Sequence, residues 1–162
     1  MDECVIDPER CASSDSGWTT YSDCAAKDPL QVELGQGDAA FAPVPAGSLP
    51  TEHQATGAQG GGTSHIFGGV RIANPDPQRR KFRVEFTACS GDKSLTQFGY
   101  PTADDCAGVL TTRIAVLESS LAQASDGSLS RGGIQVFLQG PLRWVRLEVR
   151  DPCGRSAKDQ RP

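Results

Sequence analysis

The hydrophobic and polar positions of residues 81–89 alternate one by one along the chain. One face of this stretch is mostly apolar, with Phe82, Val84, Phe86 and Ala88, and the other is polar, with Lys81, Arg83, Glu85 and Thr87. Residues 145–149 repeat the alternation with valine and leucine at every second position. A period of two is typical of a β-strand that buries one face and exposes the other.

Stretches with strand character, separated by turn residues, predict seven β-strands: residues 30–34, 41–44, 64–73, 81–89, 111–117, 133–138 and 142–150. One segment, residues 118–124, is a helical candidate, but it is too short to be stable without tertiary support. Short strands without intervening helices favour an all-β fold. We therefore expect an antiparallel two-sheet sandwich, immunoglobulin-like or fibronectin-like, with about seven strands; a small barrel is the second choice.

The chain has 162 residues, 37% of them hydrophobic, which is enough for one domain with an ordinary core. Residues 1–28 hold three cysteines and have no regular periodicity, so we expect a disulfide-stapled N-terminal coil that packs on the domain. Residues 29–155 are the predicted β-sandwich domain. Residues 156–162 are predicted to be a polar C-terminal tail.

The cysteines are even in number: Cys4, Cys11, Cys24, Cys89, Cys106 and Cys153. No two of them have the CxxC spacing of a zinc ribbon or a thioredoxin-like site, so disulfides are expected. We predict a bridge from Cys89 to Cys106 across the intervening loop. Cys153 then pairs with one of the three N-terminal cysteines, and the other two pair with each other. Full oxidation favours an extracytoplasmic compartment.

The start of the chain also bears on location. No apolar stretch approaches the roughly 20 residues of a membrane-spanning helix, and no signal peptide opens the chain. Met1 is followed directly by polar residues, so we interpret it as a start placed after a removed leader, as in a secreted or lipid-anchored precursor. The single asparagine, Asn74, is followed by Pro75 and forms no glycosylation sequon, which favours a bacterial envelope.

Charge and motifs argue against several function classes. The net charge of -4 provides no general basic field for nucleic acid. A GxGxxA motif at Gly35, Gly37 and Ala40 resembles a dinucleotide fingerprint, but prolines follow where a helix must begin, so we predict a glycine hairpin turn. No GxSxG elbow is present. We expect no catalytic residues and no cofactor.

The only two histidines, His53 and His65, bracket a glycine-rich loop. Two imidazoles brought together by a hairpin would suit copper or zinc if a third ligand joined them. The alternative is that His65 is an outward strand residue and His53 an unrelated loop residue. We favour this second interpretation and predict no metal site, and we retain metal binding as the alternative function.

A binding surface follows from the strand alternation. If the aliphatic residues of each strand face the core, the intervening aromatic and basic side chains face outward. Aromatic residues and arginines are enriched in recognition sites. The predicted binding surface consists of His65, Phe67, Arg71, Phe137, Trp144 and Arg146.

Four motifs resemble a known group of sequences: Val32-Glu33-Leu34-Gly35-Gln36-Gly37 with a following Phe41-Ala42-Pro43-Val44, the glycine loop at residues 57–61, the strand at residues 65–71, and Asp151-Pro152-Cys153-Gly154-Arg155. They are similar to uncharacterised secreted or lipoprotein-type proteins of myxobacteria. The resemblance spans about residues 30 to 155, and implies an envelope β-domain. The glycine loop departs from that pattern around the two histidines.

Together these features predict a non-enzymatic, disulfide-stabilised β-module of a bacterial envelope. Its expected role is structural, or the binding of a protein or glycan ligand. We expect no nucleic-acid partner and no transmembrane span, and the resemblance is compatible with a lipid anchor on the precursor.

Overall fold

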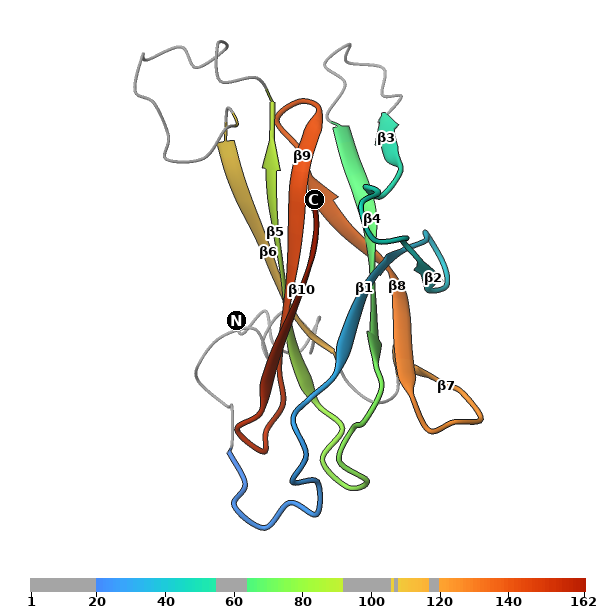
Figure 1. Ribbon diagram of the computed structural model, residues 1–162, viewed down its shortest axis with the longest axis vertical. Coiled ribbons are helices and arrows are strands. Elements are labelled where there is room, and N and C mark those ends of the chain that lie inside the picture. The colour runs from blue at the N-terminus through green and yellow to red at the C-terminus, as the bar shows by residue number, and fades with distance from the viewer. Residues whose placement is uncertain (1–19, 55–63, 92–105, 107, 117–119) are drawn as a thin grey trace, which may run out of the picture.

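The computed structural model describes residues 20–54, 64–91, 106, 108–116 and 120–162, coloured in Figure 1. Their strands are β1 (Val32–Gln36), β2 (Ala42–Pro43), β3 (Glu52–Gln54), β4 (Ser64–Ile72), β5 (Phe82–Ser90), β6 (Gly108–Val116), β7 (Ala122–Gln123), β8 (Leu129–Phe137), β9 (Leu142–Arg150) and β10 (Ser156–Arg161). Seven of these ten strands overlap the predicted stretches, whereas β3, β7 and β10 were not predicted.

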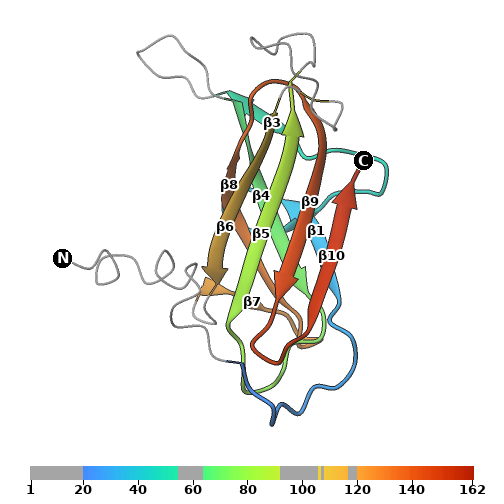
Figure 2. The ribbon, with the colours of Figure 1, turned by 90° about the vertical axis from the view of Figure 1, so that its left-hand side faces the viewer.

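The strands form two sheets in which every pairing is antiparallel. Sheet A has the order β2-β1-β4-β8-β7, and β3 pairs with β4 beyond the end of β1. Sheet B has the order β10-β9-β5-β6, and its strands lie side by side in Figure 2. The prediction of an all-β protein with two antiparallel sheets is therefore confirmed.

The prediction of a helix at residues 118–124 is wrong for the part of this segment that the structure describes. Ala122 pairs with Ser130 and Gln123 with Leu129, so this part of the segment is the edge strand β7. Pairing with β8 gives the backbone of this short segment hydrogen bonds that a single helical turn would not supply. Residues 118 and 119 lie outside the described part of the chain.

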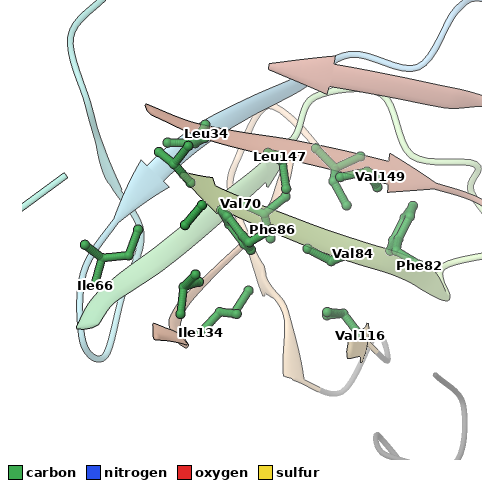
Figure 3. Packing of buried hydrophobic residues seen from close by; sticks show 14 of the residues in the cluster. Leu34, Ile66, Val70, Phe82, Val84, Phe86, Val116, Ile134, Leu147 and Val149 are labelled. Atoms are coloured by element: carbon green, nitrogen blue, oxygen red, sulfur yellow. The ribbon is translucent and has the colours of Figure 1, made fainter. Parts of the chain in front are cut away.

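The buried faces of the two sheets share one hydrophobic cluster. Leu34, Ile66 and Val70 of sheet A and Phe86 and Leu147 of sheet B lie together in Figure 3, and each is completely inaccessible to solvent. These residues occupy every second position of their strands, as the alternation predicted. Outward side chains of the two sheets consequently point away from each other, because the core lies between the sheets.

The C-terminal residues belong to the fold instead of forming a tail outside it. Ser156–Arg161 is the edge strand β10, paired with β9 from Ser156 opposite Arg150 to Arg161 opposite Val145. The hydrophobic pattern of the sequence did not predict β10, because five of the six side chains of this strand are polar. Ala157 packs against the core cluster, so the domain extends beyond residue 155.

A carboxylate joins the two sheets where β1 meets β10. The backbone N–H of Leu34 donates to Asp159 Oδ2 at 2.7 Å, and Arg161 Nη1 donates to Asp159 Oδ1 at 2.7 Å. Arg161 Nε also donates to the carbonyl oxygen of Val44 at 3.0 Å. Burial raises the pKa of Asp159, but the hydrogen bonds from Leu34 and Arg161 outweigh it and hold that pKa below its ordinary value.

Two disulfides confirm the bridges predicted for Cys89 and for Cys153. Cys89 is bonded to Cys106, and Cys153 is bonded to Cys24 of the N-terminal segment. Cys4 and Cys11 lie outside the described residues. The second bridge closes a chain separation of 129 residues, for which the chain-entropy model gives a stabilisation of about 5 kcal/mol.

Polar contacts hold residues 20–28 in place near the Cys24–Cys153 bridge. Asp76 is almost fully buried, and its carboxylate accepts hydrogen bonds from the backbone N–H groups of Ala26, Gln78 and Arg79 at 3.0 to 3.1 Å. The N–H of Tyr21 donates to the carbonyl oxygen of Pro152 at 2.7 Å. These contacts hold residues 20–28 against the strands, whereas residues 1–19 lie outside the described chain.

Candidate ligand-binding surfaces

An aromatic cluster of His53, His65 and Phe67 lies on the outer face of sheet A. His53 on β3 is the direct cross-strand partner of His65 on β4, and their ring centroids are 5.8 Å apart with the planes inclined by 24°. The ring of Phe67, two residues further along β4, lies 4.9 Å from His65 and 5.2 Å from His53. Strand pairing thus turns three residues from two strands into one contiguous group of rings.

His65 corrects one part of the predicted surface. It belongs to the outward positions of β4, as expected, but only 7% of it is exposed, so it does not offer a ring to solvent. The sequence did not predict β3, the strand whose His53 stacks against it. Nδ1 of His65 is buried and has no hydrogen-bond partner among the described residues.

Phe137 adds an exposed apolar ring to this surface. It is the cross-strand partner of His65 on the other side, at the end of β8, and 49% of it is accessible to solvent. Its outward orientation was predicted from the alternation of residues 133–138. Large exposed apolar side chains are common singly, but this one adjoins an aromatic cluster, which is the composition of a recognition surface.

Arg71 is kept apart from the aromatic cluster by the loop between β1 and β2. The N–H of Gly37 donates to the carbonyl oxygen of Phe67 at 3.2 Å, and the carbonyl oxygen of Gly37 accepts a 2.6 Å hydrogen bond from Gly133. A Cβ atom at Gly132 would lie 2.6 Å from the carbonyl oxygen of Ala40, so only glycine allows the loop to lie on the sheet here.

The same loop contains the predicted dinucleotide-like motif. Gly35 and Gln36 pair with residues of β2, and Gly37 has a positive φ of 127°, so the predicted glycine hairpin is present. Beyond it, the guanidinium of Arg71 lies 5.7 Å from the ring centroid of Phe41 and forms an ion pair with Glu33. Arg71 therefore belongs to a second, separate group on the outer face of sheet A.

Trp144 and Arg146 belong to the other sheet. Both are outward positions of β9 in sheet B, and the Arg146 guanidinium lies 5.7 Å from the centroid of the Trp144 ring. Because the outer faces of the two sheets point in opposite directions, the six predicted residues do not form a single surface. The alternation identified the outward positions but could not place them relative to one another.

A third metal ligand does not join the two histidines in the described residues. Within these residues, one group of three candidate ligand atoms lies within 4.8 Å, formed by Cys24, Asp76 and Cys153. Its two sulfur atoms are bonded to each other, so they are not available as thiolate ligands. The distance between the His53 and His65 rings would allow both imidazoles to reach one ion, as a two-ligand site.

Sequence reasoning missed a charged surface on sheet B. Arg83 and Glu85 on β5 are opposite Arg150 and Glu148 on β9, and a depression of about 290 Å³ lies among them, with Arg113 of β6 at its side. The alternating charges of residues 83–85 and 146–150 were a visible signal. Their meaning depended on the register between strands that are about 60 residues apart in the chain.

No helix in the part of the chain that the structure describes has the length and apolar character needed to cross a membrane. Comparisons of this chain with protein-family models, with curated proteins and with solved structures found no match.

Proposed function

We propose that this protein is a non-enzymatic, extracytoplasmic binding module of a bacterial envelope, built as an immunoglobulin-like or fibronectin-like β-sandwich. The sandwich assignment is supported by two antiparallel sheets that share one core. The location is supported by the two disulfides, since disulfides persist in oxidising compartments. Secretion, or lipid anchoring of a precursor, would place the module there.

The observation that carries a binding role is Phe137 beside the aromatic cluster. An apolar ring with 49% exposure costs hydration free energy unless a partner covers it. His53, His65 and Phe67 support the strand positions next to it with ring contacts of 4.9 to 5.8 Å. A protein or glycan ligand of the envelope would bury the exposed ring against this preformed platform.

Phe137→Ser is expected to weaken binding to envelope material about tenfold, because loss of an aromatic anchor typically removes more than about 1 kcal/mol of binding free energy. The measurement is cosedimentation of the purified protein with washed envelope fragments of a Gram-negative bacterium. Val109→Ser is the matched control, since Val109 is 40% exposed but lies on sheet B. If both variants bind the envelope fragments as strongly as the wild-type protein does, this role of Phe137 is contradicted.

Metal binding is the second candidate function, and the cross-strand position of His53 and His65 favours it. We nevertheless expect copper or zinc at micromolar excess to leave the melting temperature unchanged, because two imidazoles alone bind weakly. Free metal at a hundred times the Kd of a site would raise the free energy of unfolding by about 2.7 kcal/mol. For a chain of this size, this corresponds to a rise in melting temperature of roughly 5 to 10 °C. A rise of that size that disappears in His53→Ala/His65→Ala would establish the metal site instead.

A further inference from the structure

The outer face of sheet B carries ordered rows of side chains that run across its strands. In one row, Arg83 of β5 is opposite Arg150 of β9. The next row contains Arg113 of β6, Glu85, Glu148 and Lys158 of β10. The third contains Thr111, Thr87, Arg146 and Gln160, and the fourth ends at Trp144. All four strands of the sheet thus contribute polar or charged groups to one continuous surface.

This surface is positive although the chain as a whole is negative. At these paired positions, the described residues carry five cations, Arg83, Arg113, Arg146, Arg150 and Lys158, and two carboxylates, Glu85 and Glu148. The surface therefore has a net charge of +3, against -4 for the full chain. Such a segregation of charge attracts anionic ligands to one face.

The two carboxylates are already engaged by cations of the protein itself. Arg113 Nε donates to Glu85 Oε2 at 2.6 Å, and Arg150 Nη2 donates to Glu148 Oε1 at 3.2 Å. Lys158 Nζ lies 3.6 Å from Glu148 Oε2. Both glutamates thus hold the basic side chains around the depression in place, and the positive excess of the face remains.

Neutral groups with a different chemistry adjoin the charged rows. Trp144 is half-buried beneath the Arg146 guanidinium, and the exposed Thr111 places its hydroxyl oxygen 3.4 Å from that of the buried Thr87. Gln160 is exposed at the end of the same row. A flat aromatic ring beside hydroxyl and amide groups suits the apolar face and hydroxyl groups of a sugar ring.

We propose that the outer face of sheet B binds an acidic oligosaccharide. Its carboxylates lie against the guanidinium of Arg150 at the depression and against that of Arg146 further along β9, and a neighbouring sugar ring lies against Trp144. Positions 144 and 150 of β9 are separated by about 20 Å of strand, enough for several sugar units. Guanidinium groups recognise carboxylates through paired hydrogen bonds, which explains arginine in place of lysine at the centre of the face.

The test is calorimetric titration of the full chain with tetragalacturonic acid at low ionic strength. We expect saturable binding, a Kd at least about tenfold higher for Arg146→Gln/Arg150→Gln, and a similar weakening when the tetramer is methyl-esterified. The matched control is Lys27→Gln/Arg131→Gln, which removes the same two charges outside sheet B and is expected to change the Kd less than about twofold.

Three outcomes would overturn the proposal: no saturable binding of the acidic tetramer, equal Kd values for the two double variants, or equally tight binding of a tetraglutamate peptide. The last would assign the face to an acidic protein segment. The substituted residues are on sheet B, so failure here leaves the role proposed for Phe137 on sheet A unaffected.

Discussion

Val84→Asp is expected to lower the stability of the protein by several kcal/mol, whereas Glu85→Ala lowers it by less than about 1 kcal/mol. Val84 is 1% exposed and lies in the core cluster shared by the two sheets. A carboxylate at this position would be buried among aliphatic side chains without a partner. For a chain of this size, the loss corresponds to a fall in melting temperature of more than about 10 °C.

Glu85 is the matched position, because it is the next residue of the same strand and points the other way. Its carboxylate is about one-third exposed, and its ion pair with Arg113 lies at the surface, where such pairs contribute little. Thermal unfolding followed by circular dichroism measures both variants. Equal melting temperatures would mean that β5 does not separate a buried face from a solvated one.

Asp151→Ala is expected to destabilise the protein by about 3 to 5 kcal/mol, because it leaves a buried guanidinium without its counter-charge. The Asp151 side chain is completely buried and that of Arg155 is 10% exposed. Asp151 accepts hydrogen bonds from Arg155 Nε at 2.7 Å and from the backbone N–H groups of Arg155 and Cys153 at 2.8 and 3.0 Å. Denaturant unfolding gives the free-energy change.

Arg155 makes this site a junction between distant segments. Its guanidinium also donates to the carbonyl oxygens of Asp28 and Asn74 at 3.0 Å, beside the Cys24–Cys153 bridge. Asp151→Ala/Arg155→Met removes both charges and is expected to lose less stability than the sum of the two single variants. A loss below about 1 kcal/mol for Asp151→Ala would show that the pair does not hold this junction.

The long strands were predictable because their information is local. Alternation at residues 81–89 and 142–150 identified β5 and β9 and the residues that each buries, including Phe82, Phe86 and Leu147. A period of two has this effect only where one face meets a core. The pairing of Cys153 with the N-terminal segment was also predictable, because the number of cysteines there is odd.

The short edge strands were not predictable in the same way. Strand β3 (Glu52–Gln54) is wholly exposed, and β10 contains almost only polar residues. Neither shows an apolar period, since an edge strand can be held by backbone hydrogen bonds to a neighbour and needs few buried side chains. Missing β3 had a direct consequence, because that strand places His53 against His65.

The sequence by itself determined which positions of the long strands face the core and which face outward, and it determined the chemistry that those side chains bring. Only the tertiary structure decided which of them meet. It placed Phe137 beside His65 but put Trp144 on the opposite sheet, and it gathered five cations on one face of a chain with negative net charge. The physical reason is that alternation is a property of one strand, whereas a surface depends on strand order and register between segments far apart in the chain.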